Sequence, residues 1–228
     1  MTRLRDREPV ITIDGPAGAG KGTAARLLAG RLGYQLLDTG AMYRAVALSV
    51  TRAGIALDDV AALRRHLAHV DVTLADERVY LDGDDVTVAI RSQEIGQVTS
   101  GISALAPVRE KLTPLQREAA AGGGVVLEGR DTGTIVCPDA EVKFYLTASL
   151  DERARRRHIE LVARGVATGL DAVRAEIRTR DAQDQRRPLA PLRKPVDAVE
   201  VDSTDLTLAD VVDRMLAVVE QRRCYTRS

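Results

Sequence analysis

The sequence is poor in several residue types, and each shortage narrows the classes of protein to which it can belong. It contains no tryptophan, one phenylalanine and two cysteines among 228 residues. The cysteines, Cys137 and Cys224, lie far apart and form neither a CxxC motif nor a metal-ligand spacing. We therefore expect a reducing compartment and no disulfide framework. The three histidines, His66, His69 and His158, are scattered, and we assign none of them to a metal or to catalysis.

The sequence also lacks long apolar runs and an excess of either charge. No stretch reaches the length that a bilayer-spanning helix needs. Residues 1–8 mix arginine with acidic residues and lack the apolar centre of a secretory signal, which predicts a cytoplasmic protein. Basic and acidic residues number 33 each, so no global field favours nucleic acid or a membrane surface. Arginine provides 29 of the 33 basic residues; a GC-rich genome accounts for most of this excess, and phosphate recognition accounts for it only at particular positions.

The feature that constrains function most is a glycine-rich segment between an apolar run and a helical stretch. Val10–Ile13 is predicted to form a buried strand, and an Ala- and Leu-rich helix is expected from about Lys21 to Leu32. The segment consists of Gly15, Pro16, Ala17, Gly18, Ala19, Gly20, Lys21, Gly22 and Thr23. Strand, loop and helix in this order are typical of a phosphate-binding loop (P-loop). A plain connecting turn would leave four glycines and a lysine unexplained, so we expect the chain to bind a nucleoside triphosphate.

The chemistry of such a loop follows from its residue types. Glycines lack a Cβ and let backbone N–H groups curl around phosphate oxygens. The helix N-terminus adds partial positive charge, and Lys21 brings an ammonium group to the β- and γ-phosphates. The general pattern has Ser or Thr directly after the lysine, whereas here Gly22 precedes Thr23. This GKGT form resembles nucleoside monophosphate kinases and leaves open whether Thr23 contacts Mg²⁺ directly.

The rest of the chain predicts an α/β fold with a parallel sheet. Five strands are expected, at Val10–Ile13, Gln35–Asp38, Val125–Glu128, Val142–Leu146 and Val199–Val201. Their alternation with helices fits the five-stranded parallel sheet, wrapped by helices, of the P-loop kinase fold. Helices are also expected over Ala41–Arg52, capped by Thr39, and over Ser92–Gly101, Val108–Ala121 and Leu208–Gln221.

Two segments are predicted to stand off this sheet. Val70–Leu74, Val79–Leu81 and Asp85–Val88 alternate apolar and polar residues, which predicts a small antiparallel insertion. Two arginine-rich helices are expected over about Asp151–Arg164 and Asp171–Gln185. We expect the insertion and the helical pair to be mobile pieces above the sheet.

Three clusters of polar residues follow predicted strands, where parallel α/β sheets bind ligands. In the first, Thr39 and Arg44 begin a helix whose dipole could help them hold an anion, although a capped helix with a surface arginine is favoured on this cluster alone. In the second, Glu128 ends a strand, like the acid that holds Mg²⁺ through water in P-loop kinases. Arg130 and Asp131 follow it; they could form a structural salt bridge and still serve a substrate.

The third cluster is rich in arginine. It contains Arg153, Arg155, Arg156 and Arg157 in one helix, and Arg178, Arg180, Asp181, Asp184, Arg186 and Arg187 in the next. Such helices could form a nucleic-acid patch or a solvated face. Because aromatic residues are scarce and aspartates interrupt the positive charge, a lid that closes on phosphate fits better than nucleic acid.

Six motifs in order resemble the bacterial cytidylate kinases: ITIDGPAGAGKGT, LLDTGAMYR, IRSQEI, EGRDTGT, the helix at Arg153–Arg157, and RDAQDQRR at Arg180–Arg187. The resemblance runs from about Val10 through the last helix and implies ATP-dependent conversion of CMP and dCMP to their diphosphates. It implies a single kinase domain with a core over about 9–38, 106–150 and 190–225. The insertion, about 39–105, matches that family's enlarged monophosphate-binding region, and the lid covers about 151–189.

The resemblance also implies roles for individual residues. The P-loop would hold ATP with Mg²⁺, and Lys21, Arg130, Asp131, Arg156 and Arg157 would be catalytic. The residues implied to bind CMP are Thr39, Arg44, Ser100, Arg109, Arg130, Asp131, Arg180, Asp184 and Arg187. Of these, Arg44 would bind the phosphate, Ser100 the base or ribose, and Arg180 and Asp184 the ribose hydroxyls. Glu128 stands where some members carry Asp, which leaves its contact with the metal open.

Other functions fit the sequence less well. A kinase for another acceptor, such as UMP or AMP, would use the same chemistry. A GTPase-like switch is disfavoured because the sequence has no Asn-Lys-x-Asp motif for guanine. A nucleic-acid-binding ATPase is disfavoured by the neutral charge and the scarce aromatic residues. No coiled coil or long apolar edge is evident, so we expect a monomer that acts on small-molecule nucleotides and binds neither nucleic acid nor membranes.

Overall fold

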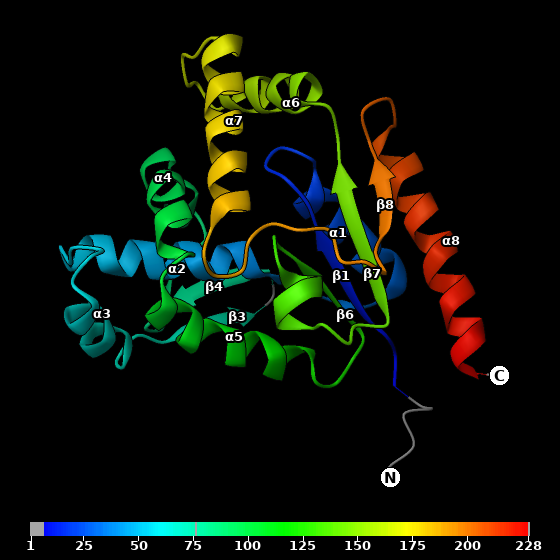
Figure 1. Cartoon of the computed structure of the whole chain (residues 1–228), viewed down its shortest axis with the longest axis horizontal. Coiled ribbons are helices and arrows are strands. Elements are labelled where there is room, and N and C mark those ends of the chain that lie inside the picture. Colours follow the sequence, from blue (N-terminus) through cyan, green and yellow to red (C-terminus); the bar gives the residue numbers. More distant parts are fainter. Residues whose placement is uncertain (1–6, 76, 228) are drawn as a thin grey trace. The chain divides into compact units, whose positions relative to one another are not determined.

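The computed structural model of the chain describes residues 7–75 and 77–227, with side chains through residue 223. It divides into two compact units (Figure 1). The first unit combines the described residues up to Leu36 with those from Gly122 onward, and the second unit consists of the described residues within Leu37–Ala121. Residues 1–6, on which the expected absence of a leader partly depends, and the side chain of Cys224 lie outside the described residues. Among the described residues, Cys137 takes part in no disulfide.

A five-stranded sheet confirms the predicted P-loop kinase architecture. Its strands are β1 (Val10–Asp14), β2 (Gln35–Asp38), β6 (Val125–Glu128), β7 (Val142–Thr147) and β8 (Val199–Asp202). Their order is β2-β6-β1-β7-β8. β1 pairs in parallel with β6 and β7, and β7 pairs in parallel with β8. The central position of β1 places the loop that follows it near the middle of the sheet edge, where ligands bind in such folds.

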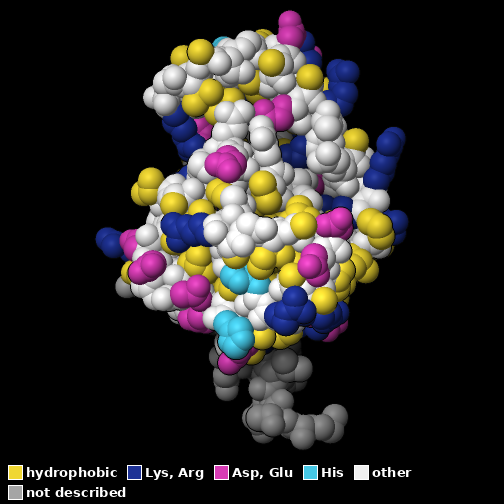
Figure 2. All heavy atoms as spheres, turned by 90° about the vertical axis from the view of Figure 1, so that its left-hand side faces the viewer, with side chains coloured by type: hydrophobic (Ala, Val, Ile, Leu, Met, Phe, Trp, Pro, Cys, Tyr) yellow, Lys and Arg dark blue, Asp and Glu magenta, His cyan; other side chains and the backbone are white. Residues whose placement is uncertain are grey.

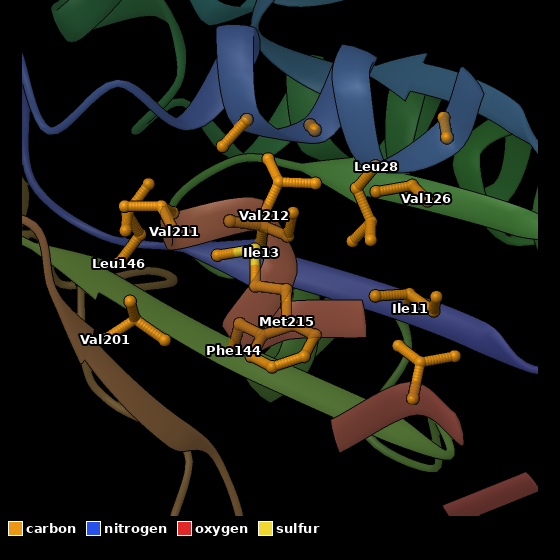
Figure 3. Packing of buried hydrophobic residues seen from close by; sticks show 14 of the residues in the cluster. Ile11, Ile13, Leu28, Val126, Phe144, Leu146, Val201, Val211, Val212 and Met215 are labelled. Carbon is orange, nitrogen blue, oxygen red and sulfur yellow. The ribbon is translucent and has the colours of Figure 1, made fainter. Parts of the chain in front are cut away.

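The core of the first unit joins this sheet to two helices. α1 (Lys21–Leu32) and α8 (Leu208–Arg227) contribute Leu28 and Met215 to one apolar cluster with Ile13 of β1 and Phe144 of β7 (Figure 3). These four side chains are fully buried. Full burial of an apolar side chain of this size contributes about 1.5–3 kcal/mol, so the cluster anchors α1, and with it the P-loop, to the sheet.

α8 extends beyond the predicted end at Gln221. Arg222 donates hydrogen bonds to the Glu141 carbonyl at 3.0 Å and to the Asp197 carbonyl at 3.3 Å. Arg223 forms an ion pair with Glu8. These contacts reach residues that are distant in sequence, so they hold the last turns of the helix although its apolar pattern has ended.

The predicted arginine-rich helical pair is also present in the first unit. α6 (Leu150–Ala163) and α7 (Leu170–Arg186) pack against each other (Figure 1). Their own small apolar cluster consists of Ala154, Leu161, Val173 and Ile177. The charged side chains therefore project from a pair of helices with its own buried contact.

The second unit contains the predicted antiparallel insertion. Its elements are α2 (Thr39–Arg52), α3 (Val60–Leu67), β3 (Val72–Ala75), β4 (Arg78–Leu81), β5 (Asp84–Asp85), η2 (Ala89–Arg91), α4 (Gln93–Ile102) and α5 (Ala106–Ala120). β4 pairs antiparallel with both β3 and β5. β5 is shorter than the predicted Asp85–Val88, because the Thr87 hydroxyl rather than its backbone accepts the hydrogen bond of the Val79 N–H, at 3.0 Å.

The start of α2 corrects one prediction from the sequence. Thr39 was expected to cap a helix beginning near Ala41, but Thr39 is itself the first helical residue and is buried. Asp38 is the cap, and its carboxylate accepts a hydrogen bond from the Ala41 N–H at 2.8 Å. Both residue types cap helices well, so the choice depends on which backbone is extended, and Asp38 has that conformation.

The surface shows no dominance of one charge on the face that Figure 2 presents. Basic and acidic side chains are interspersed there with apolar ones, in agreement with the balanced composition. Among the described residues, no helix has both the length and the apolar character required to cross a membrane.

Candidate functional site

The P-loop leaves β1 through backbone conformations that favour glycine, at Gly15, Gly18 and Gly20. Gly15 has φ of 152°, and a Cβ on it would lie 1.9 Å from the Leu146 carbonyl oxygen. Only glycine therefore lets the chain leave β1 this close to β7. Lys21, the first residue of α1, donates a hydrogen bond from Nζ to the Pro16 carbonyl at 2.8 Å. The lysine is thus folded back over its own loop.

Lys21 is buried rather than extended into solvent. Burial lowers its pKa from the ordinary value to about 7, and the neighbouring Arg130 and Arg180 guanidinium groups act in the same direction. Glu128 and Asp14 oppose the shift. Phosphate groups bound in the loop would supply negative charge next to Nζ and stabilise its protonated form.

We expect ATP binding to be linked to protonation of Lys21. Bound phosphates raise the pKa of Lys21 above its value of about 7 in the free protein, so binding at pH 8 takes up a proton. The apparent affinity for ATP should consequently fall as the pH rises above 7. Calorimetric titrations at pH 8 in two buffers with different ionisation enthalpies measure the uptake. Lys21→Met should abolish it, and a buffer-independent enthalpy in the parent protein would contradict the linkage.

Asp14, at the end of β1, holds the segment that follows β6, and sequence reasoning missed it. Its buried carboxylate accepts hydrogen bonds from the Thr132 N–H at 2.9 Å, the Thr132 hydroxyl at 2.8 Å and the Gly133 N–H at 2.7 Å. Thr132 begins a short π-helix, Thr132–Val136, which was also not predicted. Burial raises the pKa of Asp14, while these hydrogen bonds favour its ionised form. A carboxylate at the end of a largely apolar strand was the available signal.

Replacing Asp14 by asparagine should loosen the segment that carries Arg130 and Asp131. Asparagine keeps the size but can present an NH₂ group to backbone N–H donors, leaving one of them unsatisfied, which costs about 1–3 kcal/mol. We expect Asp14→Asn to have a lower free energy of unfolding in urea than the parent. We also expect a lower kcat for the phosphoryl transfer that the sequence predicts. Thr134→Ala, which removes only a 3.5 Å contact to the Asp131 carbonyl, is the control. Equal stability and kinetics of Asp14→Asn and the parent would show that Asp14 positions nothing.

A buried ion cluster connects this segment to the end of α7. Arg130 Nε lies 3.0 Å from Asp184 Oδ2, and Arg187 forms an ion pair with Asp184 Oδ1. Burial opposes ionisation of Asp184, but Arg130, Arg187 and Arg180 outweigh it and hold its pKa below the ordinary value. Arg130 therefore pairs with Asp184 of α7, whereas the salt bridge considered from the sequence joined Arg130 to the adjacent Asp131. The cluster brings together four residues that are predicted to bind CMP: Arg130, Arg180, Asp184 and Arg187.

A second ion pair ties the helical pair to the P-loop. Arg153 of α6 lies 2.5 Å from Asp181 Oδ2, and both side chains are largely buried. Arg153 also donates to the Ala17 carbonyl at 3.0 Å, and the Ala17 N–H donates to Asp181 at 3.2 Å. The sequence indicates Arg153 and Asp181 only as members of the arginine-rich cluster and gives neither of them an individual role. The structure shows that they hold both sides of one P-loop residue.

The two arginines predicted to reach the transferring phosphoryl group have protein partners in this conformation. Arg156 donates to the Ser203 hydroxyl at 2.9 Å and pairs with Glu152 at 2.8 Å. Arg157 pairs with Glu160 at 2.8 Å. Their role at the phosphoryl group stays a prediction.

The residues predicted near a metal lie at the P-loop. Glu128 is half-buried, and its Oε1 would be 3.9 Å from a Cβ on Gly22. Thr23 is exposed in the first turn of α1. Among the described residues, no three side chains of His, Cys, Asp or Glu gather as metal ligands. Mg²⁺ commonly binds through one or two protein oxygens together with substrate phosphates and water, so the donors present fit this ion.

The second unit has its own group of predicted acceptor residues. The Arg109 guanidinium carbon lies 5.7 Å from the centre of the Tyr43 ring, and its Nη1 donates to the Ser103 carbonyl at 3.2 Å. Arg44 Nη1 donates to the Ile90 carbonyl at 3.2 Å. Ser100 is half-buried in α4. Backbone carbonyls of the same unit therefore orient Arg44, which is predicted to bind the acceptor phosphate, and Arg109, which is predicted to bind CMP.

Comparison with known proteins assigns the chain to a family. The model of the family described as Cytidylate kinase matches residues 11–221. Curated cytidylate kinases of Geobacter sp. (strain M21), Geobacter sulfurreducens and Vibrio cholerae serotype O1 are 50%, 51% and 46% identical to the chain. The alignments cover 97%, 99% and 96% of this chain and 97%, 99% and 99% of those proteins.

Proposed function

Since the chain belongs to the cytidylate kinase family, we propose that it transfers the γ-phosphoryl group of ATP to CMP and dCMP. The products are ADP with CDP or dCDP. The structural observation that best supports this activity is the P-loop with Lys21 next to the Arg130, Asp184 and Arg187 cluster. A cluster with more positive than negative charge beside a phosphate-binding loop is suited to an anionic acceptor.

Phosphoryl transfer needs alignment and charge stabilisation more than covalent help from the protein. Lys21 and the arginines would bind the equatorial oxygens more tightly as negative charge grows on them in the transition state. The phosphate oxygen of the acceptor is itself the nucleophile, so a dedicated catalytic base is unnecessary. Closure of α6 and α7 would exclude water and suppress ATP hydrolysis.

We assign the acceptor roles by unit. In the first unit, Arg130 and Asp131 bind the cytosine and phosphate, Arg180 and Asp184 bind the ribose, and Arg187 joins the phosphate ligands. In the second unit, Arg44 binds the acceptor phosphate, Arg109 and Thr39 bind the nucleotide, and Ser100 meets the base or ribose. The orientation of Arg130 by Asp184, and of Arg44 and Arg109 by backbone carbonyls, supports these assignments.

We also propose that ATP binds with Mg²⁺. Thr23 through its hydroxyl and Glu128 through water would hold the ion, because both lie at the P-loop and supply oxygen ligands. When bound, Mg²⁺ would neutralise charge on the β- and γ-phosphates. The proposed functional regions are the core at about 9–38, 106–150 and 190–225, the monophosphate-binding insertion at about 39–105 and the lid at about 151–189. We propose a monomer that uses the nucleotide pool of the cytoplasm.

A panel of acceptors tests the proposed specificity. Initial rates of ADP formation should be measured with CMP, dCMP, UMP and AMP at equal concentrations. We expect CMP and dCMP to be phosphorylated much faster than AMP. Faster turnover of AMP than of CMP would overturn the proposed acceptor while leaving the kinase chemistry in place.

A further inference from the structure

Gly96 lies inside a helix where the backbone does not require glycine. It belongs to α4, and its φ is not among the positive values of the described residues. Glycine in a helix interior destabilises the helix relative to alanine, because it loses more conformational freedom on folding. Something other than backbone conformation must therefore account for the missing side chain.

The neighbour that occupies this space is Arg44. A Cβ built on Gly96 would lie 3.3 Å from Arg44 Nη1, 3.7 Å from Nη2 and 3.9 Å from Cζ. The guanidinium group therefore rests against the bare backbone of α4. Its Nη1 also donates to the Ile90 carbonyl at 3.2 Å, just before α4 begins. The Ile90 carbonyl and the backbone at Gly96 therefore both contribute to the position of the guanidinium group.

We propose that Gly96 is a positioning residue for Arg44, and that its missing side chain places the guanidinium group for the acceptor phosphate. This inference rests on the proposed role of Arg44 in binding that phosphate. A methyl group at position 96 would displace Arg44 by a few tenths of an ångström. Because the displaced atoms form the flexible end of a side chain, the change affects ligand binding and leaves folding intact.

The size of the effect follows from the geometry of guanidinium–phosphate recognition. Paired N–H···O hydrogen bonds depend on the position and plane of the guanidinium group. Since a misplacement of about 1 Å can cost about 10²-fold in rate, we expect a smaller shift to lower kcat/KM for CMP by about tenfold. The loss should appear mainly as a higher KM for CMP, with the KM for ATP unchanged.

Gly101 provides a matched control in the same helix. A Cβ there would meet Leu57 Cδ1 at 3.5 Å, which is ordinary van der Waals contact. Gly96→Ala and Gly101→Ala should therefore both have the parent's thermal stability or a slightly higher one, as alanine favours the helix. Only Gly96→Ala should have a lower kcat/KM for CMP than the parent. Equal kinetics of the two variants, or a fall in melting temperature confined to Gly96→Ala, would overturn the positioning role.

Arg44→Ala separates this inference from the function on which it rests. If Arg44→Ala has the kcat/KM of the parent, the proposed role of Arg44 fails. If Arg44→Ala loses activity but Gly96→Ala does not, the role of Gly96 alone fails. Adding Gly96→Ala to Arg44→Ala should cause no further loss, because the side chain that it displaces has been removed. A further loss would show that Gly96 acts through another residue.

Discussion

Lys21→Ala should lower kcat for phosphoryl transfer to CMP by a factor of about 10²–10³, the size commonly found when one group that stabilises transition-state charge is removed. Lys21 supplies the ammonium group of the P-loop. A hydrogen bond from its Nζ to the Pro16 carbonyl already holds this group over the loop. In the proposed mechanism, the loss of Lys21 removes positive charge that stabilises the transferring phosphoryl group most strongly in the transition state. Steady-state rates with saturating ATP and CMP measure the effect.

The same substitution should leave the fold intact. Lys21 is buried, and burial disfavours its charged form, as its lowered pKa shows. Replacing it therefore removes a desolvation penalty together with one hydrogen bond. Thermal unfolding of Lys21→Ala, and of the size-matched Lys21→Met, should resemble that of the parent. A soluble, folded Lys21→Ala protein with the parent's kcat would exclude Lys21 from the site.

Asp184→Ala should reduce both stability and activity. Its carboxylate is 1% exposed and pairs with Arg130 and Arg187, so its removal leaves two guanidinium groups without their shared counterion. Breaking a buried ion pair on one side typically costs about 3–5 kcal/mol. We expect a loss of this order in the free energy of unfolding, and lower kcat/KM for both CMP and dCMP.

A comparison of the two acceptors tests the proposed ribose contact. If Asp184 also binds the 2′-hydroxyl that dCMP lacks, Asp184→Ala should lower kcat/KM for CMP more than kcat/KM for dCMP. The difference should correspond to about 0.5–1.5 kcal/mol. Asp171→Ala is the control, because Asp171 is an exposed carboxylate of α7 that pairs only at the surface. Equal losses for CMP and dCMP would remove Asp184 from the sugar site. Parent-like stability of Asp184→Ala would contradict its place in the ion cluster.

The features that were predictable from the sequence are local ones. The P-loop combines a strand, a glycine-rich turn and a helix within about two dozen residues, so its pattern is visible along the chain. The five strands and the antiparallel insertion likewise follow from apolar runs and alternation. Helix α1 was predicted with its observed bounds, Lys21–Leu32, because Gly33 marks its end.

The missed features are contacts between distant parts of the chain. Asp14 bonds to Thr132 across 118 positions, and Ala17 bonds to Asp181 across 164. Neither partner carries a local signal that names the other. Asp14 is conspicuous as a carboxylate at the end of a buried strand, but the strand does not show what it bonds to. Asp181 lies in a polar segment, where a charged residue commonly faces solvent. The contact of Gly96 with Arg44 was invisible for the same reason. The sequence pattern thus indicated which residues are suited to binding and catalysis. The folded structure determines which of them hold the others in place.

The direct test of the proposed function follows the phosphoryl group itself. ATP labelled in its γ-phosphate should be incubated with CMP and Mg²⁺, and the labelled products separated. We predict that the label appears in the β-phosphate of CDP, with one ADP formed for each labelled CDP. Label released only as inorganic phosphate, at a rate unaffected by CMP, would identify an ATPase and contradict the proposed kinase.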